Sequence, residues 1–274
     1  MSNKSKININ YSLKEEAIHL ICSLSCNGVI KPNNFVKEIE NTYKTIICEI
    51  QHNKCSPKKA KYVYTKTENF IKKCLTNEEK NILDNLCKNE DIYKNINKYF
   101  EILKNSKNNY FKIYDTYNIF ITQYGCGGTY AVAPKSNSST GEEAIIYVRQ
   151  DAKEGKLAHN IFHEMIHLAI EDSIVNKYRL KDVEKEILVD FICTLVIEDF
   201  KVQKFEQNEE AKKFRNLLET LSKEVKTNDK QNKDQKAETI NTIIDKVIKK
   251  LGENMQNNLQ NAEKDIQSEN EKQI

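Results

Sequence analysis

The fold predicted for this chain depends most on the sequence His163-Glu164-Met165-Ile166-His167. On a helix, side chains four positions apart lie on one face, so both imidazoles can reach one metal ion. The surrounding sequence favours such a helix, because hydrophobic residues recur with a helical period at positions 157, 158, 161, 162, 165, 166, 169 and 170. Asp151, followed three residues later by Glu154, resembles a capping box and predicts that the helix begins there.

The glutamate between the two histidines adds a chemical role to this geometry. A catalytic zinc ion takes three protein ligands and keeps one position open for water. Glu164 lies beside the first histidine, where a carboxylate can accept a proton from the water that the metal activates. The pattern therefore predicts that His163 and His167 bind zinc and that Glu164 is the general base of a hydrolase. The alternative is a chance match, in which the histidines are ordinary buried residues.

A third ligand is expected in the next predicted helix, from Asp182 to about Phe200, whose apolar residues also recur with a helical period. Glu186 borders this apolar stripe, and Asp190 follows one turn later on the same side. Such a pair suits a ligand carboxylate and a second carboxylate that orients a ligand histidine. The sequence therefore favours Glu186 as the third ligand, with an ordinary charged helix edge as the alternative.

Two other carboxylates compete for the role of third ligand. Glu184 opens the same helical segment and is the rival of Glu186. Glu171 follows His167 by one helical turn and points along the same face, but it lies too far up a straight helix to complete one tetrahedron. We therefore expect Glu171 to lie outside the set of ligands.

The order His163-Glu164-x-x-His167, eighteen residues, and then Glu186-x-x-x-Asp190 resembles the gluzincin type of zinc metallopeptidase, which includes thermolysin-like and aminopeptidase N-like enzymes. The resemblance covers about residues 125–198. It implies a zincin-like core and a zinc-dependent hydrolysis of peptide bonds, with zinc bound by His163, His167 and Glu186. It also implies that Glu164 is the general base and that Asp190 holds a ligand histidine.

The resemblance is weaker for the groups that would stabilise an oxyanion. Thermolysin-like enzymes have a tyrosine between the second histidine and the ligand glutamate, and Tyr178 stands in a comparable place, with Arg179 as an alternative. The Gly-Ala-Met-Glu-Asn motif of the aminopeptidases is missing. His167 is the last histidine of the chain, so no downstream histidine is available as a second donor.

A glycine-rich segment, Tyr124 to Pro134, precedes the histidine helix and lies between two strand-like runs, 110–123 and 143–149. Residues 135–141 indicate a loop or a hairpin turn. In zincin folds an edge strand before the active helix binds the substrate backbone by strand addition, and residues 127–132 stand where that strand is expected. A glycine-rich bend that binds no ligand is the alternative.

These segments predict an α+β fold that is predominantly helical and has three regions. Residues 1–108 form a helical N-terminal region, in which residues 1–10 are expected to be disordered and amphipathic helices follow at about 12–27, 34–52, 57–75, 78–88 and 91–105. Residues 109–205 form the zincin-like core, with a small sheet (an edge strand plus a hairpin) packed on the histidine helix. Residues 206–274 form a helical, partly disordered C-terminal extension.

The C-terminal extension contains a predicted helix over 206–225, a solvated linker over 226–236 and an apolar stripe from Ile240 to Leu251. The stripe indicates a helix over about 237–260 that can dock on a protein partner as a coiled coil does. The alternative is a helix that packs on its own domain.

Composition narrows the classes of function. The chain has 274 residues and a net charge of only +3, which gives little support to nucleic-acid binding. No convincing signal peptide or membrane-spanning run is found, so we expect a cytoplasmic protein without a membrane partner. The eight cysteines have no Cys-x-x-Cys spacing and are expected to be reduced, with Cys126 an ordinary loop residue rather than a redox-sensitive thiol. His19 and His52 are likewise expected to be ordinary residues.

Together the motifs predict a zinc-dependent, endopeptidase-like hydrolase that acts on a peptide or protein substrate, which could be one specific intracellular protein. The alternative from another class is a non-catalytic zincin-like scaffold that binds a partner protein through its helices. A Glu164→Gln variant that keeps zinc but loses turnover would distinguish the enzyme from the scaffold.

Overall fold

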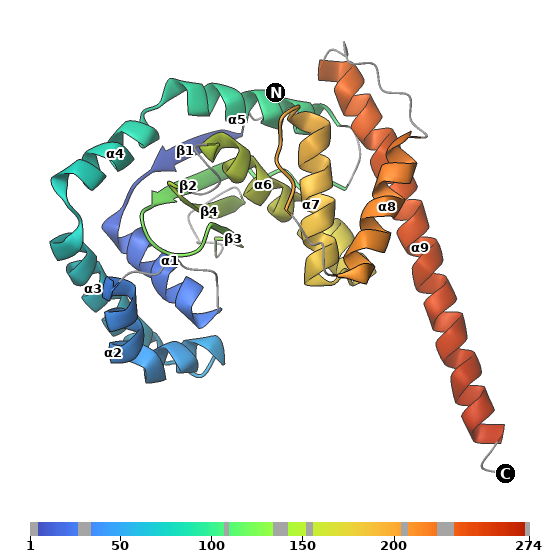
Figure 1. The fold of residues 1–274 in the computed structure, drawn as a ribbon, viewed down its shortest axis with the longest axis horizontal. Helices are drawn as coiled ribbons and strands as arrows, with labels where there is room; N and C mark the ends of the chain where they lie inside the picture. Colours follow the sequence, from blue (N-terminus) through green and yellow to red (C-terminus); the bar gives the residue numbers. More distant parts are fainter. Residues whose placement is uncertain are drawn as a thin grey trace. The chain divides into compact units, whose positions relative to one another are not determined.

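The computed structural model describes residues 5–26, 34–106, 110–133, 142–151, 156–203, 208–223 and 233–271. Most of them are helical and a few form a small sheet, which confirms the predicted α+β class (Figure 1). The chain divides into two structural units, residues 1–97 with 113–168 and residues 98–112 with 169–274. Each unit therefore combines parts of more than one of the three predicted regions. The zincin-like character of the core stays a prediction.

A mixed sheet of four strands lies in the first unit, in the order β1-β2-β4-β3 (Figure 1). Its strands are β1 (Lys6–Asn10), β2 (Thr116–Thr122), β3 (Gly128–Val132) and β4 (Glu143–Arg149). β1, β2 and β4 are parallel, and β3 runs antiparallel to β4. The predicted edge strand and the strand after it are therefore neighbours, although the predicted loop 135–141 lies outside the described residues.

The N-terminal strand β1 corrects the prediction that residues 1–10 are disordered. Its pairing with β2 begins at Lys6 opposite Thr116 and continues to Asn10. The Tyr93 hydroxyl accepts a hydrogen bond from the backbone N–H of Ile9 (3.2 Å) and donates one to its carbonyl (3.4 Å). The sequence gives a weak signal for this strand, because asparagine is poorly represented in strands and the pairing partner is far along the chain.

Five helices follow β1 as predicted: α1 (Leu13–Ser25), α2 (Asn34–Gln51), α3 (Pro57–Cys74), α4 (Asn77–Cys87) and α5 (Glu90–Asn105). Side chains of Ser12, Ser56 and Thr76 accept backbone hydrogen bonds at the starts of α1, α3 and α4, so these helices begin at good N-caps. The apolar faces of α1, α2 and α3 share one buried cluster that includes Leu20 and Ile39. This cluster stabilises the first unit by removing apolar surface from water.

The second unit contains a π-helix, η1 (Glu171–Asn176), and the helices α7 (Asp182–Val196), α8 (Glu209–Lys223) and α9 (Lys233–Glu271). The apolar stripe of α9, from Ile240 to Leu251, is buried and the helix packs on α7 and α8. These residues therefore follow the alternative interpretation, in which the helix packs on its own domain. α9 begins inside the predicted linker 226–236, of which residues 226–232 lie outside the described part.

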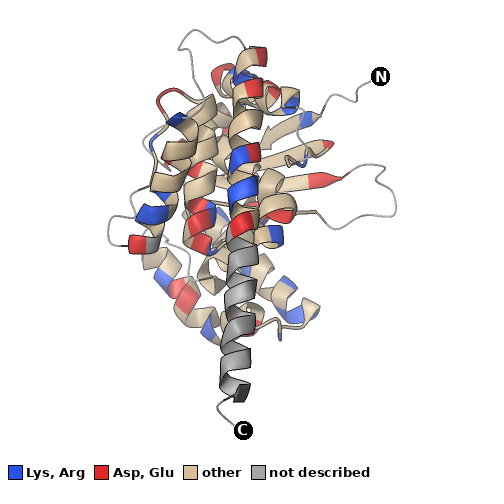
Figure 2. Ribbon diagram, turned by 90° about the vertical axis from the view of Figure 1, so that its right-hand side faces the viewer, with Lys and Arg blue, Asp and Glu red and all other residues tan. Residues whose placement is uncertain are grey.

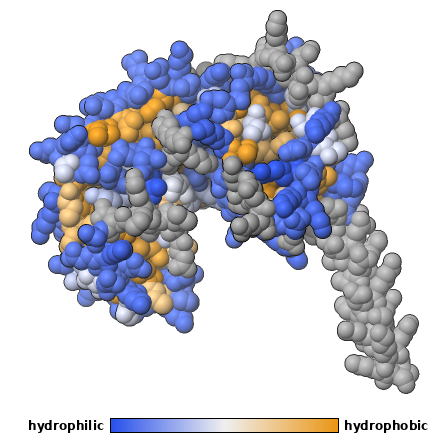
Figure 3. Space-filling model, in the orientation of Figure 1, coloured by the Kyte–Doolittle hydropathy of each residue, from blue (hydrophilic) through white to orange (hydrophobic). Residues whose placement is uncertain are grey.

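Charged residues of both signs occur on the described helices (Figure 2). The surface in view over these helices is mostly hydrophilic, with hydrophobic side chains showing between them, as expected for amphipathic helices whose apolar faces are buried (Figure 3). Within the described residues, no helix combines the length and the apolar content that crossing a bilayer would require.

Candidate metal centre

Helix α6 (Leu157–Ile170) carries the His-Glu-x-x-His motif in a buried setting. His163 is 4% exposed, His167 is 2% exposed and Glu164 is 9% exposed. The helix begins six residues after Asp151, so the predicted capping box does not start it. The Asp151 carboxylate instead accepts a hydrogen bond from Nε of Arg149, and Glu154 lies outside the described residues.

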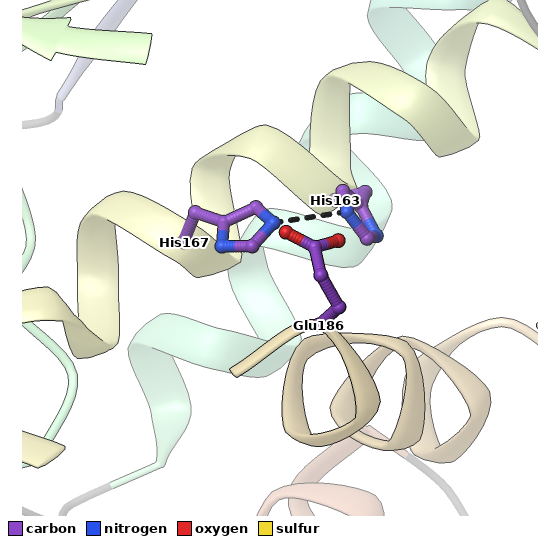
Figure 4. Close-up of side chains that lie close together, drawn as sticks. All are labelled: His163, His167 and Glu186. Atoms are coloured by element: carbon purple, nitrogen blue, oxygen red, sulfur yellow. Dashed lines mark hydrogen bonds between the residues drawn. The ribbon is translucent and has the colours of Figure 1, made fainter. Parts of the chain in front are cut away.

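The two histidines and Glu186 of α7 lie close together (Figure 4). One ligand atom from each of the three side chains lies within 4.8 Å of the other two. The Nε2 atoms of His163 and His167 are 3.0 Å apart, and their ring planes are inclined by 76°. Nitrogen ligands of tetrahedral zinc sit roughly 3.3 Å from one another, so the imidazole pair has close to the spacing that such an ion requires.

The chemistry of these donors fits zinc. Two imidazole nitrogens and one carboxylate oxygen form the His₂Glu set that binds zinc in hydrolytic sites, where one position stays open. A metal ion binds imidazole in its neutral form, through a ring nitrogen that carries no proton. The structure therefore brings together the three residues that the sequence predicts as ligands.

The two rival carboxylates, Glu184 and Glu171, have other contacts or positions. The Glu184 side chain accepts a hydrogen bond from the backbone N–H of Lys181 (2.9 Å), at the start of α7. Glu171 opens the π-helix η1, which the sequence does not predict. A π-helix has hydrogen bonds over five residues and a wider turn, so the face that carries the histidines does not continue in register beyond Ile170. Neither glutamate belongs to the described group of three donors.

The two residues considered for an oxyanion role lie between η1 and α7. The ring of Tyr178 lies beside Gly252 of α9, and the Lys177 ammonium is 5.4 Å from the centre of that ring. Arg179 is exposed and has a left-handed backbone conformation, with a φ of 54°. The oxyanion roles of Tyr178 and Arg179 stay predictions.

Strand β3 approaches α6 at two points. A β-carbon on Gly128 would lie 2.3 Å from Oε1 of Glu164, so the glycine lets this carboxylate rest against the strand. Two residues later, the Tyr130 ring stacks on His167, with centroids 5.1 Å apart and planes inclined by 14°. Tyr130 was not predicted as a site residue, although the two-residue period of a strand places it on the same face as Gly128.

Helix α1 supports the turn that leads into β3. Glu16 accepts hydrogen bonds from the backbone N–H groups of Gln123 and Tyr124, at 2.7–3.1 Å. His19 contacts the Thr122 hydroxyl (3.0 Å) and the Cys126 thiol (3.4 Å). Ser23 accepts a hydrogen bond from the Cys126 N–H (3.0 Å). These three buried polar side chains, Glu16, His19 and Ser23, lie on one face of α1 and fix the turn over residues 122–126.

Burial changes the ionisation of this support. It raises the pKa of Glu16 to about 8 and lowers the pKa of His19 to about 4, with the nearby Arg149 cation adding to the second shift. Burial also raises the pKa of the Cys126 thiol, which disfavours the reactive thiolate. His19 thus stabilises the turn that leads into β3, a role that the sequence does not indicate.

The proposed ligand Glu186 is held by a residue that the sequence analysis did not consider. Nε2 of Gln203 donates a hydrogen bond to Oε2 of Glu186 (3.0 Å). The Gln203 N–H donates to Oδ2 of Asp190 (2.5 Å), and the Arg215 guanidinium donates to the Gln203 carbonyl (2.8 Å). Asp190 therefore contacts the backbone of Gln203, whose side chain contacts the proposed ligand Glu186. The predicted contact of Asp190 with a ligand histidine stays a prediction.

Comparison with known proteins gives no match: no family model, no curated protein and no solved structure matches this chain.

Proposed function

We propose that this protein is a zinc-dependent peptide-bond hydrolase. The observation that carries the proposal is the convergence of His163, His167 and Glu186 within 4.8 Å. The donors come from two separate helices and include two buried imidazoles, which is an arrangement that a metal ion stabilises. Glu164 lies between the two histidines in the sequence, on the helix that carries both.

Each residue of the site has a role in this proposal. His163, His167 and Glu186 would hold the zinc ion, which when bound activates a water molecule and polarises the scissile carbonyl. Glu164 would accept a proton from the attacking water and deliver it to the leaving amine. Gly128 leaves room for the Glu164 carboxylate, and Tyr130 restrains the His167 ring by stacking on it.

The β3 edge of the sheet favours an extended peptide as the substrate. β3 is an edge strand of the described sheet, and an extended segment can add to such an edge through main-chain hydrogen bonds. A peptide paired with β3 would pass close to Glu164 and His167, because Gly128 and Tyr130 contact these residues. At the other edge, Tyr93 already binds the backbone of Ile9, which hinders addition to β1.

The decisive experiment compares the wild type with Glu164→Gln. Each protein is loaded with zinc, its zinc content is measured, and it is incubated with a peptide library derived from a proteome. The proposal expects cleavage by the wild type, loss of cleavage with a chelator, and loss of cleavage in the variant at unchanged zinc content. Zinc binding without cleavage in the wild type would instead favour a non-catalytic scaffold.

A further inference from the structure

Gln203 links Glu186 to two other residues of the second unit, Asp190 and Arg215. We infer that Gln203 is a positioning residue, which orients the Glu186 carboxylate for metal binding and is itself fixed by Asp190 and Arg215. This inference rests on the proposed function, because it concerns the third ligand of the same site.

The side chain of Gln203 acts on the ligand directly. A glutamate reaches a metal through three rotatable bonds, and ordering such a side chain costs conformational entropy. The hydrogen bond from Nε2 of Gln203 to Oε2 of Glu186 (3.0 Å) restricts the rotation of the carboxylate before a metal binds. A neutral amide also leaves the negative charge of the carboxylate available to the cation, whereas a lysine in its place would neutralise that charge.

The backbone of Gln203 is fixed on both sides. Its N–H donates to Asp190, which is 1% exposed, and its carbonyl accepts from Arg215 of α8. Both contacts involve a charged partner, and such hydrogen bonds are stronger than neutral ones. They hold Gln203 in place although it lies in the non-helical segment after α7.

This network gives Asp190 a role that the sequence pattern does not reveal. Asp190 lies one turn after Glu186 on α7, so the ligand and the anchor of its support belong to one rigid helix. Movement of α7 would carry both carboxylates together and keep Gln203 on Glu186. The spacing Glu186-x-x-x-Asp190 thus places Asp190 where it fixes Gln203, which in turn orients Glu186.

The test measures zinc affinity by competition with a chromogenic chelator, which needs no substrate. Loss of a residue that orients a metal ligand typically weakens binding by about 10–100-fold. We expect Gln203→Leu to show a loss in this range and Arg215→Met to show a smaller one. Val202→Ala is the matched control, because the neighbouring valine has no polar group that could hold Glu186, and it should bind zinc as the wild type does.

A double-variant cycle with Glu186→Ala separates positioning from general damage. If Gln203 acts through Glu186, then Gln203→Leu weakens zinc binding in the wild-type background and has no further effect in the Glu186→Ala background. Equal losses in both backgrounds, or wild-type affinity in Gln203→Leu, would overturn the inference and leave the proposed function standing. Failure of the wild type to bind zinc, or an unchanged affinity in Glu186→Ala, would overturn the ligand set and this inference with it.

Discussion

Replacing Gly128 with alanine should slow peptide hydrolysis while zinc binding stays unchanged. A β-carbon at this position would lie 2.3 Å from Oε1 and 2.9 Å from Cδ of Glu164. A carbon atom and a non-bonded oxygen normally stay about 3.3 Å apart, so the carboxylate would have to retreat by roughly 1 Å. Misplacement of a reacting group by about 1 Å can cost about 100-fold in rate, and we expect a loss of that size in kcat.

The adjacent glycine provides the control for this variant. A β-carbon on Gly127 would meet no atom within 4 Å, so Gly127→Ala should keep the kcat of the wild type. Gly128 does not have a positive φ, so alanine should be tolerated by the backbone. The two variants therefore differ mainly in their contact with Glu164.

The assay follows kcat and KM on a peptide that the wild type cleaves, with zinc content and the melting temperature measured for each variant. A Gly128→Ala protein with the kcat of the wild type would refute the reasoning, because the position of the carboxylate would then be irrelevant to the reaction. Equal losses in both alanine variants would also refute it, since the damage would then come from the strand and not from Glu164.

Three further changes test other parts of the structure. Glu186→Ala should weaken zinc binding far more than Glu164→Gln does in a chelator competition, because only the former removes a donor; similar affinities would argue against the ligand role. Glu16→Gln should reduce the pH dependence of unfolding by urea. The pKa of Glu16 rises from its ordinary value of 4.5 to about 8 in the folded protein, which keeps its proton while the unfolded chain releases it. The free energy of unfolding of the wild type should therefore fall as pH rises from 4.5 to about 8, by at most about 5 kcal/mol. An identical fall in the variant would exclude Glu16 as its source. Leu20→Ala should lower the free energy of unfolding by about 2–5 kcal/mol, because Leu20 is fully buried in the cluster of α1, α2 and α3; an unchanged urea midpoint would contradict that packing.

Residues related by a helical period were predictable from the sequence. His163 and His167 share a face because they stand four positions apart on one helix. Glu186 could be placed on the border of the apolar stripe of α7 by the same period. Glu184 could have been set aside earlier, since it stands in the third position of its helix, where a glutamate commonly binds the backbone N–H of the N-cap residue.

Contacts between distant segments were not predictable in this way. Tyr130 and Gln203 contact the site from a strand and a loop. The period of the strand relates Tyr130 to Gly128, but it does not show that this face meets His167, and the loop that holds Gln203 has no period. His19 contacts the turn at residues 122–126 across more than a hundred positions, and its own helix gives no sign of that partner. The π-helix η1 was missed because no simple sequence rule predicts where an α-helix widens.

The pairing of β1 with β2 has a consequence for the order of folding. Lys6 pairs with Thr116, and the helices α1 to α5 lie between them in the chain. On the ribosome, the first strand emerges long before its partner, and joining the two closes a large loop at an entropic cost. The nascent helices can form from local contacts, but the sheet must wait for β2 and β4. We therefore expect the part of the site that depends on β3 to mature late, after the N-terminal helices have been translated and packed.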